Sequence, residues 1–173
     1  MPTLILDPQP NEIAELIARR RRLDLDRADE VWDGVYHMNP APHGRHARVA
    51  AQIAVILDAP ARAAGLLTLF GGFNLGHAND YRVPDGGLLR GGPHGVYYDT
   101  AALVIEIVSP DDESWQKLPF YAAHNVDELV IVDPQDHSVR WLALDQGEYH
   151  DLAERSGLID LDAAQLAARI DWP

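Results

Sequence analysis

The sequence predicts one α/β (α+β) domain, spanning residues 1–173, in which helices flank a central β-sheet. Its 173 residues, of which 47% are hydrophobic, suit a single hydrophobic core. Residues 101–108 are almost continuously apolar, as expected for a strand that is covered on both faces. Residues 43–59 repeat apolar side chains at helical spacing, which predicts a long helix with one buried face.

The first elements of the chain are a helix and a hairpin. An amphipathic helix is predicted over residues 11–22, where it ends in four consecutive arginines. We interpret these arginines either as a solvated helix end, which the helix dipole favours, or as a phosphate-binding patch. Residues 30–38 place the pair Asp33-Gly34 between two short strands, which is the usual signal of a β-hairpin.

The middle of the chain is predicted to continue from helix to strand. Pro60 should end or kink the helix of residues 43–59, because proline lacks a backbone donor and disfavours helix at the residue before it. Any further turn should close at Gly65, in the manner of a helix C-cap. Residues 66–70 and 86–90 are predicted strands.

The C-terminal half starts with the strand of residues 101–108, which Ser109-Pro110-Asp111 breaks. This break favours a cap for a helix that reaches about His124. Residues 127–132 are predicted as a second buried strand and residues 138–144 as an alternating one. The tail holds a hairpin-like stretch around Tyr149 and a short apolar helix from Asp162.

The cysteine count, the lengths of the apolar runs and the net charge exclude several classes of function. The chain has no cysteine, which excludes disulfides, zinc ribbons and thiol nucleophiles and fits a cytoplasmic location. No apolar run approaches the roughly 20 residues of a membrane span, and the start lacks the basic region of a signal peptide. A net charge of −13 opposes generic nucleic-acid binding. A nucleic-acid substrate would therefore need a local basic patch or bound metal ions.

The candidate chemistry centres on Glu106, the single charge in the apolar strand. Burying an ionised carboxylate costs several kcal/mol unless a partner compensates it, and a divalent metal would do so. Asp85, 21 residues earlier at the start of a predicted strand, offers a second oxygen ligand for Mg²⁺ or Mn²⁺. Lys117 could orient or help deprotonate an attacking water, or stabilise charge on a phosphorane-like transition state.

These residues carry a resemblance to a known superfamily. Pro84-Asp85, then Glu106, then a lysine is similar to the PD-(D/E)XK nucleases, although Val108 stands where the strict motif has lysine. The segments 103–110, 117–123 and 127–134 resemble one branch, a large bacterial family of restriction-endonuclease-like proteins. In that branch the lysine has moved from the strand to the following helix.

The resemblance extends upstream to roughly residues 28–143 and has two departures. Glu30-Val-Trp-Asp-Gly resembles the early acidic segment of the family, and His46 lies where the family often has a histidine. Gly86-Gly87 replaces the apolar residues that usually follow Pro-Asp. Between Pro110 and Lys117 the family is usually basic, with an aspartate, whereas this chain has residues 111–116, an acidic run that begins Asp-Asp-Glu.

The resemblance implies a restriction-endonuclease-like fold with a mixed central sheet and a Mg²⁺- or Mn²⁺-dependent endonuclease. Asp85, Glu106 and the backbone carbonyl of Ile107 would ligate the metal, and Lys117 would position the water. Glu30 and His46 are further candidate catalytic residues: Glu30 to complete the metal shell, and His46 to contact phosphate or act as a base. The resemblance also implies nucleic acid, DNA rather than RNA, as the partner, and a homodimer as the assembly.

Each candidate also has a structural interpretation. Glu106 could pair with a buried arginine or lysine, Asp85 could be a turn residue, and Lys117 could be an exposed helix lysine. Glu30 could be a surface acid at a hairpin edge, and His46 a structural residue at a helix start. Two other functions stay open: a catalytically inactive nuclease-fold protein that binds partners, and a metal-dependent hydrolase of another phosphate ester.

Overall fold

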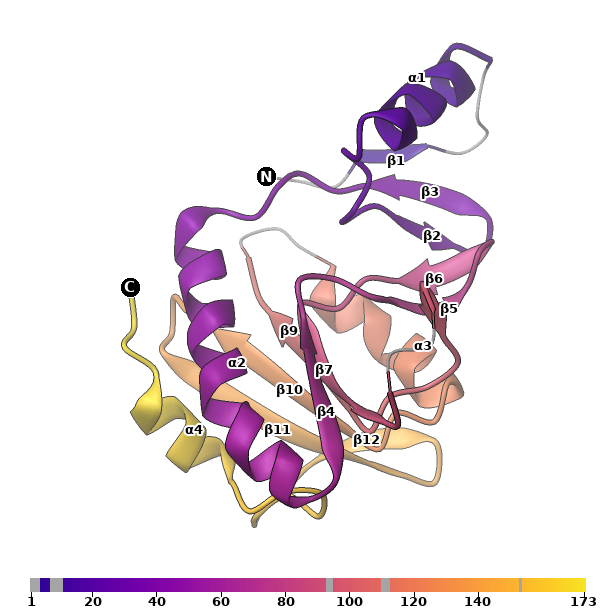
Figure 1. Ribbon diagram of the computed structural model, residues 1–173. Coiled ribbons are helices and arrows are strands. Elements are labelled where there is room, and N and C mark those ends of the chain that lie inside the picture. Colours follow the sequence, from indigo (N-terminus) through magenta and orange to yellow (C-terminus); the bar gives the residue numbers. More distant parts are fainter. Residues whose placement is uncertain (1–3, 7–10, 93–94, 110–112, 153) are drawn as a thin grey trace.

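The computed structural model describes residues 4–6, 11–92, 95–109, 113–152 and 154–173. Within them the strands form two six-stranded sheets (Figure 1). The central sheet has the strand order β12-β11-β10-β9-β7-β4. Its strands are β4 (Leu66–Phe70), β7 (Gly86–Arg90), β9 (Leu103–Ile107), β10 (Glu128–Asp133), β11 (Ser138–Asp145) and β12 (Glu148–Asp151). β9 and β10 are parallel and the other pairs antiparallel, which confirms the predicted mixed central sheet.

Helices cover both faces of the central sheet, as predicted (Figure 1). α2 (Gly44–Ala63) and α4 (Ala163–Arg169) pack on one face, against Leu103, Ile105 and Ile107 of β9. α3 (Leu118–Ala123) packs on the other face, which includes Val104. Because side chains alternate along a strand, Glu106 shares the face of Val104 and points toward α3.

Pro60 does not end the long helix. It lies inside α2, which continues to Ala63, so of the predicted outcomes at Pro60 the structure shows the further turn and not the end. Ala61 is fully buried in the core, and this packing holds the last turn in place. The chain leaves the helix at Gly65 with a φ of 73°, as predicted for the closing residue.

The second sheet has the strand order β1-β3-β2-β6-β5-β8 and was not predicted as a unit. Its strands are β1 (Leu4–Leu6), β2 (Glu30–Trp32), β3 (Val35–Met38), β5 (Asn74–His77), β6 (Asp80–Arg82) and β8 (Tyr97–Tyr98). The predicted hairpin is confirmed as β2 and β3, with Asp33 and Gly34 both at positive φ, as a tight hairpin turn requires. β5, β6 and β8 are too short to show an alternating pattern.

The predicted N-terminal helix is confirmed as α1 (Asn11–Arg22), which packs on the second sheet through Ile17. Arg20, within the arginine run, donates to both carboxylate oxygens of Asp29 at 2.8 and 2.9 Å. Asp29 also accepts from the Tyr36 hydroxyl at 2.6 Å. At Arg20, therefore, the arginine run is structural.

A 3₁₀ helix, η1 (Ser114–Lys117), leads directly into α3. The helix predicted to reach His124 is thus present, although it begins later than the Ser-Pro-Asp break suggested. Residues 110–112 of that break lie outside the described residues. The helices of the described ranges include none that is long and apolar enough to span a membrane.

Candidate active site

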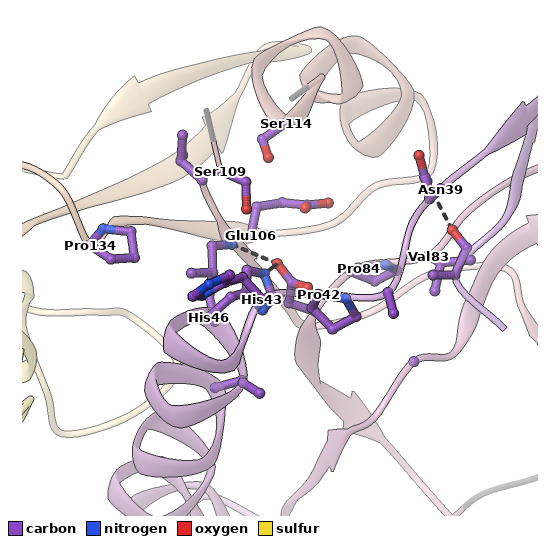
Figure 2. A pocket seen from close by; sticks show the side chains of 18 of the residues that line it. Asn39, Pro42, His43, His46, Val83, Pro84, Glu106, Ser109, Ser114 and Pro134 are labelled. Carbon is purple, nitrogen blue, oxygen red and sulfur yellow. Dashed lines mark hydrogen bonds and ion pairs between the residues drawn. The ribbon is translucent and has the colours of Figure 1, made fainter. Parts of the chain in front are cut away.

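A pocket of about 1300 Å³ lies where the start of α2, the end of β9 and η1 come together. Figure 2 shows Glu106 in this pocket, between Ser114 of η1 and the two histidines at the start of α2, His43 and His46. Glu30 and Asp85 also line it, from the second sheet and from the segment before β7. The pocket therefore gathers residues from distant parts of the chain.

Asp85 is held at the end of β9. One of its carboxylate oxygens accepts a hydrogen bond from the backbone N–H of Ile107 at 2.7 Å. The same oxygen lies 3.1 Å from Nε2 of His46, which reaches it from the first turn of α2. Both contacts keep the Asp85 carboxylate next to the residue that follows Glu106.

Lys117 lies between two acids. Its Nζ is 2.9 Å from Oε1 of Glu30 and 3.3 and 3.4 Å from the two carboxylate oxygens of Glu106. Only 8% of Lys117 is exposed, so the interpretation as an exposed helix lysine is wrong. Lys117 is also the sole lysine among the 14 basic residues of the chain. The other 13 are arginines, so the chain places its one ammonium group in this pocket.

Glu30 is buried and fully engaged. It is 1% exposed, so the interpretation as a surface acid at a hairpin edge is wrong. Its Oε1 accepts from the backbone N–H of Val83 at 2.7 Å as well as from Lys117. Its Oε2 accepts from the indole N–H of Trp32 at 2.7 Å. Glu30 therefore joins the second sheet to the lysine.

Tyr121 is a site residue that the sequence interpretation missed. Its hydroxyl donates a hydrogen bond to Oε1 of Glu106, and the whole side chain is buried. Tyr121 follows Lys117 by four residues, a spacing that places two side chains on the same face of a helix. That spacing was the available signal, and it would have pointed to Tyr121 once Lys117 was a candidate.

Burial and the charges in the pocket shift the pKa values of both Glu106 and Lys117. Burial raises the pKa of Glu106 to about 8, against the attraction of Lys117 and together with repulsion from Asp85 and Glu30. Burial alone would lower the pKa of Lys117, but attraction to Glu106 and Glu30 outweighs it and raises that pKa. Lys117 is therefore a stable cation, and the pocket holds more acids than this cation can balance.

The two departures from the family pattern have structural explanations. At Gly86 an added Cβ would clash with the Phe70 ring, and at Gly87 it would lie 2.7 Å from the carbonyl oxygen of Leu103 and 2.9 Å from the Phe73 ring. Neighbouring aromatic rings thus fill the space of the usual apolar side chains. Of the acidic run, Glu113 lines the pocket and contacts Nδ1 of His37 at 3.0 Å.

All six predicted site residues line the same pocket: Glu30, His46, Asp85, Glu106, Ile107 and Lys117. Glu106 does pair with a buried lysine, as its structural interpretation stated, and that lysine is the predicted catalytic one. In the described part of the chain, no three His, Asp or Glu side chains form a ready metal-binding group. Any cation here would therefore rely on two carboxylates and further ligands.

Comparison with known proteins decides the family. Residues 16–165 match the family described as "Uma2: Putative restriction endonuclease", which covers all of the site residues. The chain belongs to the Uma2 family. This confirms the predicted restriction-endonuclease-like family of the PD-(D/E)XK superfamily. As a Uma2 protein the chain is a member of a nuclease family, and divalent metals are general to nucleases of this kind.

The fold of this Uma2 protein is similar to a solved structure. That structure is described as a putative nuclease belonging to DUF820 from Anabaena variabilis ATCC 29413. The TM-score is 0.65 at 16% sequence identity, over 83% of this chain and 92% of the other. At this identity the likeness shows the fold. No curated protein is significantly similar to the chain.

Proposed function

We propose that the chain is a divalent-metal-dependent endonuclease that hydrolyses phosphodiester bonds of nucleic acid, with DNA as the preferred substrate. One observation carries the proposal: the sole lysine of the chain is buried in the pocket between Glu30 and Glu106, beside the carboxylate of Asp85. Membership of the Uma2 family supports nuclease chemistry at this site.

The donor set fits a hard divalent cation such as Mg²⁺ or Mn²⁺. Mg²⁺ is usually bound by one or two carboxylates, and water and substrate phosphate complete its shell. Asp85 and Glu106 would supply the two carboxylates. Repulsion from Asp85 and Glu30 helps to raise the pKa of Glu106, and a bound cation would relieve that repulsion.

Ile107 would supply the third ligand through its backbone carbonyl. In an extended strand the N–H and C=O of one residue point to the same edge, and the Ile107 N–H points to Asp85. Its carbonyl is therefore expected on the Asp85 side as well. This geometry supports the proposed role of Ile107.

Each remaining residue has a proposed task in hydrolysis. A bound divalent cation supplies Lewis acidity and lowers the pKa of its water. Lys117 keeps its proton at neutral pH, so we assign it to hold the attacking water and to stabilise negative charge on the phosphate. We assign Glu30 to hold Lys117, since both of its oxygens are engaged, and His46 to orient Asp85.

A local positive charge would bring nucleic acid to this acidic protein. Arg27 and Arg45 line the pocket and have exposed side chains. Phosphate groups are attracted by such arginines even where the net charge of the protein is −13. The two arginines support a polyanionic substrate at the pocket mouth.

Nicking of supercoiled plasmid in the presence of Mn²⁺ tests the proposal. Wild type should nick the plasmid, and Lys117→Ala should lower the rate by about 100-fold or more. Arg90→Ala, a change outside the pocket, should keep the wild-type rate. Equal rates for wild type and Lys117→Ala would place the activity in a contaminant and defeat the proposal.

A catalytically inactive nuclease-fold protein is the second candidate. The excess of acids in the pocket, with Glu113 added to Glu30, Asp85 and Glu106, favours it. This candidate predicts no cleavage of DNA or RNA with either metal. A phosphodiesterase screen on small substrates covers the third possibility, a hydrolase of another phosphate ester.

The proposal also covers the domain structure, the oligomeric state and the cellular location. It takes residues 1–173 as one domain, a homodimer as the working assembly and the cytoplasm as the location. Light scattering of the purified protein measures the molar mass directly. A mass of one chain at micromolar concentration would remove the homodimer from the proposal.

A further inference from the structure

The Glu30 carboxylate is fixed by an indole. Trp32, two residues later on β2, donates its Nε1–H to Oε2 of Glu30 at 2.7 Å. The other oxygen of Glu30 faces Lys117 at 2.9 Å. One carboxylate thus connects the indole to the ammonium group. Trp32 holds its Oε2, and the backbone N–H of Val83 holds its Oε1 at 2.7 Å.

The Trp32 ring is itself held on both faces. The His37 ring stacks on it with centroids 4.3 Å apart and an angle of 15° between the planes. The guanidinium carbon of Arg82 lies 4.4 Å from the centroid of the Trp32 ring. Such stacking of a buried cation on an aromatic ring is attractive and restricts the ring to one position.

Arg82 continues this stack to the helix that follows Lys117. The Phe120 ring lies 3.9 Å from the guanidinium carbon of Arg82, and Phe120 is three residues after Lys117. Arg82 is 5% exposed, and its Nη1 donates to the carbonyl of Val31 at 2.9 Å. Nη1 also pairs with Oδ1 of Asp80 at 2.8 Å, so these acceptors and the two rings together define the position of the guanidinium.

We propose that Trp32 is a positioning residue, which fixes Glu30 and through it holds Lys117 in the pocket. A lysine side chain has four rotatable bonds and adopts many rotamers unless its ammonium group is tied. Without the indole donor, Oε2 of Glu30 has no donor, and the carboxylate is held only through Oε1, by the Val83 N–H and Lys117. The carboxylate can then turn about Oε1, which loosens the short contact that fixes Lys117. The catalytic consequence of this role rests on the proposed function.

Trp32→Phe removes the indole donor and keeps an aromatic ring in the stack, although a smaller one. The chain offers a matched control. Trp141 donates its Nε1–H to Oε2 of Glu128 at 2.8 Å, in the central sheet and outside the pocket. Trp141→Phe removes the same kind of bond and leaves Glu30 and Lys117 untouched.

The single lysine gives a readout that needs no activity. Protein labelled with ¹³C at the lysine ε carbon yields one signal, from Lys117, in a ¹³C–¹H correlation spectrum. A fixed side chain gives its two ε protons distinct shifts, and a rotating one averages them. Wild type and Trp141→Phe should show two separate proton shifts, and Trp32→Phe should show one averaged shift.

The nuclease rate is the second readout. Trp32→Phe should lower kcat by about tenfold, with KM within about twofold of wild type. Separate ε-proton shifts in folded Trp32→Phe would overturn the positioning role. Averaged shifts in a variant whose wild type cleaves nothing would support the positioning role and defeat the proposed nuclease function.

Wild type alone supplies a measurement that does not depend on how the variant folds. The Trp32 indole N–H should exchange with solvent at least about 100-fold more slowly than that of Trp115, which is 44% exposed. Slow exchange at Trp32 agrees with a persistent bond to Glu30. Exchange as fast as that of Trp115 would overturn the proposal.

Discussion

The Asp85 carboxylate accepts a hydrogen bond from the backbone N–H of Ile107 at 2.7 Å, which joins two segments 22 residues apart. β7 and β9 are antiparallel, with Gly86 opposite Ile105. One further step of this register places Asp85 opposite Glu106. The two acids are therefore brought together by the pairing of their strands.

Removal of one carboxylate should weaken metal binding. Glu106→Gln keeps the shape of the side chain and removes its charge, so we expect Mn²⁺ affinity to fall by at least about tenfold. Isothermal titration calorimetry measures this Mn²⁺ affinity. Glu148→Gln, an exposed change on β12, should bind Mn²⁺ as wild type does. The same affinity in Glu106→Gln and wild type would refute Glu106 as a ligand.

Metal affinity should depend on pH through Glu106. Burial raises the pKa of this carboxyl to about 8, and only the ionised form binds a cation. Mn²⁺ affinity should therefore rise by up to about tenfold per pH unit below pH 8 and level off above it. Titrations between pH 6 and 9 test this, and a flat profile for wild type would contradict it.

The stability of the metal-free protein should show the opposite trend. Because burial raises the pKa of Glu106 from 4.5 to about 8, the folded state holds a proton that the unfolded state releases in this window. The contribution of Glu106 to stability is present below pH 4.5 and is lost as pH rises toward 8. Urea unfolding with a chelator should show wild type losing stability relative to Glu106→Gln, by up to about 1.4 kcal/mol per pH unit. A constant difference would show that Glu106 does not titrate there.

The confirmed predictions came from sequence patterns that lie within a few neighbouring residues. The apolar strand with one acid located β9 and Glu106, and the Asp33-Gly34 pair located the hairpin, because each signal lies within a few residues. Lys117 came from its position after Glu106 together with the family resemblance, and Glu30 came from the resemblance. Their burial could not be read from sequence, since it depends on η1 and β2 meeting in space.

The missed features all depend on contacts between distant segments. β5 and β6 owe their pairing to each other and to β2, and their three- and four-residue lengths carry no periodic signal. The link from Trp32 to Glu30 depends on packing. Sequence patterns describe a residue's neighbours along the chain, and these contacts are formed by the fold.

Loss of the Tyr121 hydroxyl should weaken both stability and metal binding. Tyr121→Phe leaves the buried Oε1 of Glu106 with only its longer contact to Lys117, and loss of such a buried hydrogen bond typically costs about 1–3 kcal/mol. The pKa of Glu106 should rise further, so Mn²⁺ affinity at pH 7 should fall. Tyr149→Phe is the matched control, because its hydroxyl donates to the carbonyl of Val126 at 2.7 Å, away from the pocket. It should lose stability alone, and equal Mn²⁺ affinity in both variants would contradict the role of Tyr121.

The arginines at the end of α1 should contribute unequally to the free energy of unfolding. Arg20 pairs with Asp29, whose side chain is fully buried, whereas Arg21 lies 3.9 Å from Asp26 at the surface. Arg20→Ala leaves a buried carboxylate without its cation and should cost about 3 kcal/mol, measured by urea unfolding. Arg21→Ala should cost less than about 0.5 kcal/mol, as exposed pairs contribute little. If Arg20→Ala were as stable as Arg21→Ala and instead bound DNA more weakly, Arg20 would belong to a phosphate-binding patch.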